Sequence, residues 1–335
     1  MAGIITSLRH YSSDVKITAL SNNPEETREL HGIDAVERGV FPRAAADADL
    51  FICGGGSLFQ DATSARSVIY YLGQFWYCSR IAKTKSAVYA QGIGPLSRRW
   101  VRILTAKILD NASLITLRDF ESAQLLQQIG VREPRIEVTA DPAFALPRIG
   151  REAGKHYLRE RGIGSAPLIA ICPRRWRGFD GNESVITAVS TFTSEIGAAA
   201  LFIPMFPLQD SGLTSKMAAG CPAFVDGGLL NDYRGIRKAI AGSDLLISTR
   251  LHGLIFAVRE GIPAIGISYD PKVESFCKMC GIPYLEITDF SSQELLNLMR
   301  QVWNERDSIS ASEYAISCEL VNRAICNAQM VLDLI

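Results

Sequence analysis

The chain has 335 residues, of which 47% are hydrophobic and 21% are charged, and its 35 Lys and Arg balance 35 Asp and Glu. At about 100–200 residues per domain, this length predicts two domains, and the hydrophobic content is sufficient for a large buried core. The lack of a basic excess argues against a nucleic-acid-binding protein, and the modest charge argues against a disordered chain.

The sequence lacks the segments that would direct a protein into or across a membrane. No stretch reaches the roughly 18–20 apolar residues of a membrane helix, and residues 1–14 lack the basic start, apolar centre and cleavage site of an export signal. Only Cys277 and Cys280 form a CxxC pair, and no second pair or histidine cluster accompanies them. We therefore expect a cytoplasmic protein with reduced cysteines and with neither a metal nor a cofactor.

Short apolar runs alternate with longer amphipathic segments, which predicts βαβ units around parallel sheets. In the first half, apolar residues at three- and four-residue steps predict helices over 64–83 and 98–112. Residues 141–164 combine proline, glycine and charge, and are interpreted as the linker between two domains. The strands expected in this half are 14–20, 49–55, 86–92, 113–119 and 135–141.

The second half repeats the alternation, with helices expected over 183–197 and 230–243 and two or three more over 291–335. Its expected strands are 167–174, 199–206, 223–228, 244–250, 263–270 and 283–288. The fold class is therefore α/β, with two Rossmann-like domains, residues 1–147 and 148–335, facing a cleft. Ligands of such sheets bind outside the carboxyl ends of the strands, so the strand-to-loop junctions are the candidate sites.

The first junction is the glycine run Gly54, Gly55 and Gly56. Consecutive glycines let the backbone approach a ligand closely and offer amide donors. The spacing matches neither a dinucleotide-binding motif nor a P-loop, so a plain strand-to-helix turn is an equal alternative. A second glycine-rich turn follows Gln91, which either faces a ligand or lies in an ordinary turn.

The arginines that follow strands suit anion binding. Arg118 lies at the end of strand 113–119, where a guanidinium can hold a phosphate or carboxylate through two hydrogen bonds. The structural alternative is an ion pair with Asp119 or Glu121. Another basic loop follows strand 167–174 and either holds an anionic donor or lipid diphosphate, or is simply solvated: Arg174, Arg175 and Arg177.

The sharpest signal is the segment Arg250, Leu251, His252 and Gly253, which runs from a buried strand into an apolar helix. Helix N-termini attract anions through unpaired amides and the helix dipole. His252 is one of four histidines, and imidazole is the usual proton-transfer group near neutral pH. Although a lone histidine is commonly structural, its place between arginine and glycine at this junction favours a functional role.

Taken in order, the motifs DLFICGGGSLFQD, YAQGIGPL, LRDFES, TADPAF and STRLHGLIFA resemble the polysaccharide pyruvyl transferase family, in particular its CsaB-type members. The resemblance implies a ketalpyruvyl transferase similar in architecture to GT-B glycosyltransferases. Such enzymes transfer pyruvate from phosphoenolpyruvate to two hydroxyls of a sugar as a cyclic ketal and release phosphate. The acceptor implied is a lipid-linked, N-acetylmannosamine-containing precursor of a secondary cell-wall polymer that anchors surface-layer proteins.

The resemblance also implies roles for individual residues. Arg118, Arg250, Leu251 and His252 match functional positions of the family, so we expect Arg118 and Arg250 to hold phosphoenolpyruvate and His252 to act as general acid or base. We expect the acceptor in the first domain, phosphoenolpyruvate in the second, and at most a peripheral contact with the inner face of the membrane. The residues expected to contact substrate are Gly54, Gly55, Gly56, Gln91, Arg174, Leu251 and Gly253.

One departure from the family is expected to matter. Members usually begin with a strand and a Gly-Asn-x-Gly-Asp/Glu loop, whereas residues 1–5 here resemble the helix that follows that loop. A missing strand would expose an edge of the first sheet and weaken acceptor binding. Two other functions stay open at this point: a GT-B-type glycosyltransferase or sugar-nucleotide epimerase, and a non-catalytic ligand sensor or scaffold.

Overall fold

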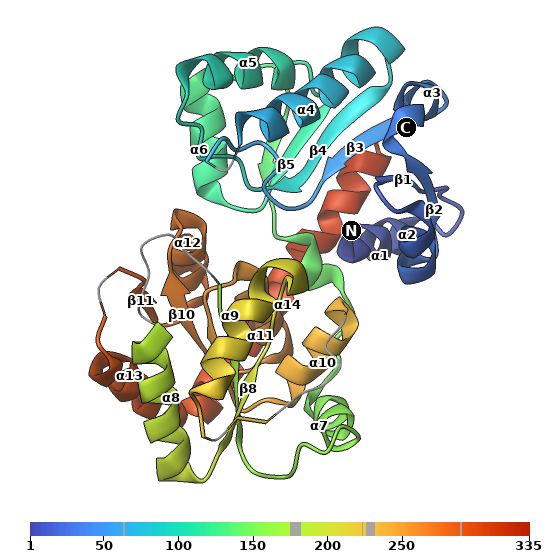
Figure 1. Cartoon of the computed structure of the whole chain (residues 1–335). Helices are drawn as coiled ribbons and strands as arrows, with labels where there is room; N and C mark the ends of the chain where they lie inside the picture. Colours follow the sequence, from blue (N-terminus) through green and yellow to red (C-terminus); the bar gives the residue numbers. More distant parts are fainter. Residues whose placement is uncertain (63, 175–181, 223, 226–231, 289) are drawn as a thin grey trace. The chain divides into compact units, whose positions relative to one another are not determined.

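The computed structural model describes all residues except 63, 175–181, 223, 226–231 and 289 (Figure 1). The chain forms two units, unit 1 (Met1–Leu146 with Leu320–Ile335) and unit 2 (Pro147–Glu319). The first boundary lies one residue before the expected end of the first domain. Residues 320–335 were expected in the second domain but belong to unit 1, because Ala328 and Val331 pack against the unit 1 sheet.

Unit 1 is built on a four-stranded parallel sheet in the order β3-β4-β5-β6. Alternating side chains supply its two faces: Val88 of β4 faces one core, and Tyr89 faces the other. The strands are β3 (Leu50–Gly54), β4 (Lys85–Gln91), β5 (Leu114–Leu117) and β6 (Ile136–Val138).

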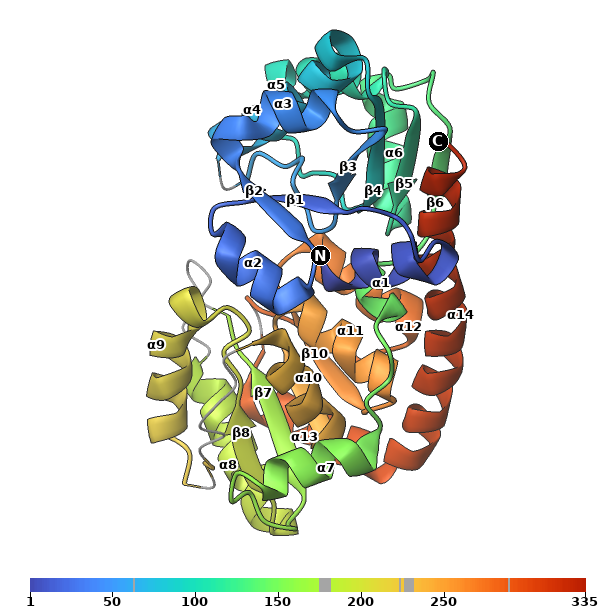
Figure 2. The same ribbon diagram turned by 90° about the vertical axis from the view of Figure 1, so that its right-hand side faces the viewer.

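Helices cover both faces of this sheet. One face packs against α4 (Ala65–Trp76), α5 (Arg99–Leu109) and α6 (Phe120–Ile129). The other face packs against α1 (Ala2–Tyr11) and the final part of α14 (Arg306–Leu332), whose last turns lie beside the sheet in Figure 2. The expectation that the first residues of the chain are helical is confirmed.

A small βαβ element completes unit 1: β1 (Thr18–Ser21), α2 (Pro24–His31) and β2 (Asp34–Glu37). Strand β2 was not predicted from the sequence, because four residues with two exposed ends carry too little periodicity. The remaining elements are η1 (Arg38–Val40), α3 (Phe41–Ala46), the π-helical η2 (Tyr77–Ala82) that extends α4, and η3 (Pro142–Ala145).

Unit 2 has a five-stranded parallel sheet in the order β11-β10-β9-β7-β8. Its strands are β7 (Leu168–Cys172), β8 (Ala199–Phe202), β9 (Leu245–Ser248), β10 (Ala264–Ser268) and β11 (Tyr284–Glu286). The expected strand 223–228 lies largely outside the described residues, and Phe224 makes only an isolated bridge to Ala200.

Helices again lie on both sides of the unit 2 sheet. One face packs against α8 (Asn182–Ile196), α9 (Pro207–Ala219) and α13 (Ser292–Asn304). The remaining helices of the unit are α7 (Arg151–Arg159), α10 (Tyr233–Gly242), α11 (Leu251–Glu260) and α12 (Pro271–Cys280).

The linker expected over 141–164 is instead partly helical, with η3 in unit 1 and α7 in unit 2. Helix α7 buries Tyr157 and Leu158 against α10. Gly154 permits the contact, since a Cβ there would lie 2.3 Å from the amide nitrogen of Gly242. The glycine and charge that suggested a linker therefore belong to a short helix with one closely packed face. In the described parts of the chain, no helix is both long and apolar enough to cross a membrane.

Candidate functional site

The strand order of unit 2 reverses between β7 and β9. From β7 the chain passes to β8 at one edge and then returns to β9 on the opposite side of β7. The carboxyl ends of strands on either side of such a reversal form the usual ligand site of a doubly wound sheet. Arg174 follows β7 and Arg250 follows β9, so both sequence candidates flank this point.

The turn after β9 is held by its own side chains. Ser248 Oγ accepts a hydrogen bond from the Arg250 amide at 3.0 Å and donates one to the Arg250 carbonyl at 2.8 Å. Gly253 lies in the first turn of α11, where a Cβ would lie 2.5 Å from Ser248 Oγ and 3.4 Å from the Cys172 Cβ. Gly253 therefore allows the helix to begin directly against the ends of β7 and β9.

Arg250 is the N-cap residue of α11 and its side chain is nearly buried. Its Nη2 donates to the fully buried carboxylate of Asp210, and its guanidinium carbon lies 4.8 Å from the centre of the Phe206 ring. The buried Nε makes no hydrogen bond to any residue that the structure describes. A buried donor without a partner costs about 1–3 kcal/mol.

Asp210 was not identified from the sequence. It lies in the first turn of α9, where an acidic residue is commonly explained by the helix dipole. Its Oδ2 does accept the Phe206 amide at 2.9 Å, as a local cap would, while Oδ1 faces Arg250. In the sequence, Asp210 could be recognised only as an acidic residue near the start of a helix, which does not distinguish a local cap from a partner of Arg250.

Arg174 pairs with Tyr269, which follows β10. The guanidinium carbon lies 4.4 Å from the centre of the Tyr269 ring, and Nη1 donates to the phenol oxygen. Burial raises the pKa of Tyr269, and the charges of Arg174 and Arg250 partly oppose that effect. Because β9 lies between β7 and β10, this pair lies on either side of the end of β9, where Arg250 supplies a second cation. Arg175 and Arg177 lie outside the described residues.

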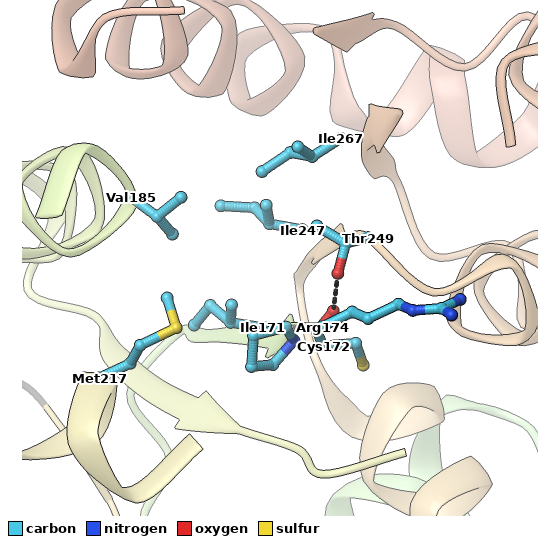
Figure 3. A pocket seen from close by; sticks show the side chains of 9 residues that line it. Ile171, Cys172, Arg174, Val185, Met217, Ile247, Thr249 and Ile267 are labelled. Atoms are coloured by element: carbon cyan, nitrogen blue, oxygen red, sulfur yellow. Dashed lines mark hydrogen bonds between the residues drawn. The ribbon is translucent and has the colours of Figure 1, made fainter. Parts of the chain in front are cut away.

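Figure 3 shows a cavity beneath these loops. It is apolar and small, about 10 Å³, which is the room of roughly one water molecule. Thr249 donates to the Cys172 carbonyl at 3.2 Å, and Arg174 points away from the side chains of Val185 and Met217. A sugar or phosphoenolpyruvate cannot fit inside, so a ligand of unit 2 would bind on the loops rather than in this cavity.

His252 and Leu251 occupy the first turn of α11 and are partly exposed. The His252 ring lies 6.2 Å from the Phe256 ring, centre to centre. The three consecutive residues Arg250, Leu251 and His252 thus surround the helix N-terminus, where amide donors and the dipole favour an anion. A cation and a group able to transfer protons are therefore adjacent in the chain.

In unit 1, the glycine run connects β3 to the loop that follows it. Gly55 and Gly56 both have φ +76°, a left-handed conformation that residues with a Cβ rarely adopt. A Cβ on Gly54 would lie 2.6 Å from Ile4 Cδ1 of α1. The backbone conformation thus favours glycine at positions 55 and 56, in keeping with the alternative of a plain turn, whereas a side chain at 54 would only displace the end of Ile4. Neither finding excludes ligand contact.

The side chain of Gln91 connects this loop to the end of β3 through hydrogen bonds. Its side chain is fully buried, with Nε2 donating to the Cys53 carbonyl at 3.1 Å and Oε1 accepting from the Leu58 amide at 3.1 Å. Gln91 was expected to contact substrate, but its amide group is committed to joining the ends of β3 and β4.

Arg118 lies among three acidic and polar side chains of unit 1. Its Nη1 is 2.7 Å from Asp141 Oδ2, its Nε is 3.8 Å from Asp119 Oδ2, and its Nη2 donates to Ser57 Oγ at 3.1 Å. The guanidinium also lies against Gly92, where a Cβ would be 3.0 Å from Nε. The ion pair with Asp119 was the expected alternative, whereas the closer partner, Asp141, had been identified only as a strand end.

The CxxC pair lies within helix α12. Cys277 and Cys280 are buried in α12 with free thiols, and burial raises the pKa of each to about 12. Among the described residues, no group of three or more His, Cys, Asp or Glu side chains could hold a metal ion.

Comparison with solved structures defines the class of fold. HepE from Anabaena, in complex with UDP and glucose, matches with a TM-score of 0.68 and 12% identity over 99% of this chain and 94% of its own. A Rickettsia africae glycosyltransferase matches with a TM-score of 0.66 and 12% identity, over 99% of this chain and 94% of its own. The Neisseria meningitidis UDP-GlcNAc 2-epimerase matches with a TM-score of 0.63 and 11% identity, over 100% of this chain and 95% of its own. The chain therefore has the two-sheet α/β fold of GT-B-like glycosyltransferases and epimerases, as expected.

The sequence defines the family more narrowly. The model of the polysaccharide pyruvyl transferase family matches residues 1–271, and the chain belongs to this family of transferases. A curated relative, the amylovoran biosynthesis protein AmsJ of Erwinia amylovora, is 23% identical over an alignment of 254 residues that covers 70% of this chain. The matched region spans 60% of the length of that relative.

Proposed function

We propose that the chain transfers the pyruvyl group of phosphoenolpyruvate to two hydroxyls of a saccharide as a cyclic ketal and releases phosphate. Family membership supports the reaction class. The observation that carries the residue assignment is Arg250, a nearly buried guanidinium at the start of α11 whose Nε has no partner among the described residues. An anion seated at this helix end would accept that hydrogen bond.

Unit 2 supplies the donor site in this proposal. Phosphoenolpyruvate carries a phosphate and a carboxylate on adjacent carbons, and Arg174 and Arg250 are two cations close to the end of β9. Arginine forms paired hydrogen bonds to either anion. The amides of Leu251 and His252 at the α11 N-terminus add donors and a favourable dipole.

His252 is assigned the proton transfers. Protonation of C3 of phosphoenolpyruvate gives a methyl group and leaves C2 as an oxocarbenium ion. One sugar hydroxyl then bonds to C2 and gives its proton to His252, which restores the proton that His252 supplied to C3. The second hydroxyl bonds to C2 as the C2–O bond to phosphate breaks, and its proton leaves with phosphate as hydrogen phosphate. The products are one ketal and one hydrogen phosphate, with no oxidant or reductant required.

The saccharide is assigned to unit 1, near the loop Gly54–Gly56. There, Arg118 is already paired with Asp141 and Asp119, so we give it the role of holding the loops in shape rather than of gripping phosphoenolpyruvate. The proposed acceptor is a lipid-linked saccharide at the inner face of the membrane, with N-acetylmannosamine as in CsaB-type enzymes. The relative named for amylovoran biosynthesis supports testing other polysaccharide precursors beside it.

The test is phosphate release from phosphoenolpyruvate with and without a lipid-diphosphate disaccharide ending in N-acetylmannosamine. His252→Ala should lower acceptor-dependent release by about 10²–10⁴-fold if His252 transfers protons. The matched control is His156→Ala, an exposed histidine of α7 that pairs with Glu160, and it should retain full release. A loss below about threefold for His252→Ala would remove His252 from the mechanism. Turnover of a UDP-sugar without release from phosphoenolpyruvate would overturn the proposal.

A further inference from the structure

The segment between Asp61 and Asp110 has an unusual charge distribution. It contains no Asp or Glu, although the whole chain has equal numbers of acidic and basic residues. This segment comprises α4, η2, β4 and α5 of unit 1. Its basic residues are Arg66, Arg80, Lys83, Lys85, Arg98, Arg99, Arg102 and Lys107. A local excess of this kind attracts polyanions even where the whole protein is neutral.

The helices of this segment present large apolar side chains outward. Their inner faces, with Val68, Leu72 and Val101 among others, are fully buried on the sheet. On their outer faces, Trp76 of α4 is 47% exposed and Trp100 of α5 is also 47% exposed. Ile69, Ile81 and Ile103 are exposed on α4, η2 and α5. We call these five side chains and the exposed arginines and lysines around them the α4–α5 face.

The positions follow from helix geometry and packing. Exposed residues of α4 recur at 66, 69, 73 and 76, which is one stripe of a helix with 3.6 residues per turn. Helices α4 and α5 contact each other on the same side of the unit 1 sheet (Figures 1 and 2). The exposed stripe of α4 and the exposed Trp100 and Ile103 of α5 therefore belong to adjacent helices of one layer.

Among the residues that the structure describes, four basic side chains of this face make no ion pair. Arg66, Arg80, Arg99 and Lys107 are exposed on the same elements as the apolar residues. The carboxylate of Asp61 lies 3.5 Å from Arg98, but Asp61 is buried and receives the amides of Ser97 and Arg98. It neutralises one arginine of the segment.

From this surface we infer that the α4–α5 face docks on an anionic lipid bilayer. Tryptophan is favoured at the membrane–water interface, and isoleucine gains by entering the acyl region. The surrounding arginine and lysine side chains pair with lipid phosphates while their aliphatic stems lie along the bilayer surface. A nucleic acid would satisfy the charges and could stack on the tryptophans, but it offers no environment for three exposed isoleucines. The inference rests on this surface and not on the proposed reaction.

The experiment measures co-sedimentation of the full chain with vesicles. We expect binding to phosphatidylcholine vesicles containing about one third phosphatidylglycerol, weak binding to pure phosphatidylcholine, and loss at high salt. Trp76→Ala with Trp100→Ala should abolish binding. Arg80→Gln with Arg99→Gln should weaken it about 30-fold, since each charge contributes about fivefold.

Two controls keep the result specific. Met279→Ser and Lys278→Gln remove an exposed apolar and an exposed basic side chain of α12 in unit 2 and should leave binding unchanged. Circular dichroism checks that each variant is folded. Failure of the chain to bind anionic vesicles, or unchanged binding of the double tryptophan variant, overturns the inference. So does equally tight binding of a DNA duplex that displaces the vesicles. Phosphate release is measured separately with a detergent-solubilised acceptor, so failure of docking and failure of pyruvyl transfer are distinguishable.

Discussion

Asp210→Asn is expected to damage unit 2 far more than an ordinary surface substitution. The carboxylate is completely buried and faces the guanidinium of Arg250, whose side chain is 8% exposed. Asparagine has nearly the same shape and can still accept the Phe206 amide through its oxygen. The change therefore removes one negative charge with little change in packing, and it leaves the Arg250 charge buried without a counterion.

Removal of one partner from a buried ion pair typically costs about 3–5 kcal/mol. Asparagine retains a polar oxygen, so we expect the lower end, about 3 kcal/mol, which is more than a hundredfold in the folding equilibrium constant. For a unit the size of unit 2, this corresponds to a fall in Tm of about 6–12 °C. The KM for phosphoenolpyruvate should also rise, because Asp210 holds Arg250 in place.

The assay is thermal and urea unfolding followed by circular dichroism, with Glu195→Gln as the matched control. Glu195 pairs with Arg300 in the same unit, but the two side chains are 35% and 44% exposed, and such pairs contribute about 0–1 kcal/mol. Asp210→Leu with Arg250→Met should recover stability without recovering activity, since no buried charge remains. If Asp210→Asn loses no more stability than Glu195→Gln, the buried pair is not stabilising and the argument is refuted.

Three further outcomes follow from the structure. Gly253→Ala should lower the free energy of unfolding by about 1–3 kcal/mol, because the added Cβ clashes with Ser248 Oγ. Ser248→Ala should partly restore it in a double-mutant cycle. Additive losses of unfolding free energy in the double variant would contradict the contact. Burial raises the pKa of Glu313 to about 8, so the free energy of unfolding should fall as the pH rises from about 4.5 to about 8. Urea unfolding at several pH values measures this fall, which Glu313→Gln should lack. The exposed thiols of Cys318 and Cys326 should react with iodoacetamide at pH 8 before any buried cysteine, as read by peptide mass spectrometry; equal rates would contradict the burial.

The fold was largely predictable because its strands are short apolar runs. Strands β7, β9 and β10 are fully buried and lie within the predicted ranges. Helix α7 was not predicted, since its glycine is explained only by the approach of Gly242 from α10. The amphipathic pattern of α14 also could not show which sheet its last turns would cover, because an apolar stripe on a helix can pack against the apolar face of either sheet.

The candidate site was predictable to the level of its loops but not of its contacts. The place of Arg250 and His252 at the start of a helix followed from the change of hydrophobic pattern at residue 250. The partnership of Arg250 with Asp210 did not, because the two residues are distant in sequence and a first-turn aspartate already has a local explanation. The hydrogen bonds of Gln91 to Cys53 and Leu58 were not predicted for a related reason: the sequence identifies a strand end but not the partners of its side chain.

Helix α14 begins in unit 2 and ends in unit 1, and this has a consequence for the order of folding during synthesis. Unit 2 is contiguous, so all of it is available once residue 319 has been made. Unit 1 starts first, yet the sheet face near Tyr89 lacks its cover from Ala328 and Val331 until these two residues have left the ribosome, after all of unit 2 has been made. The N-terminal unit is therefore the last to be completed, and in the nascent chain its apolar face is the surface most in need of protection from aggregation.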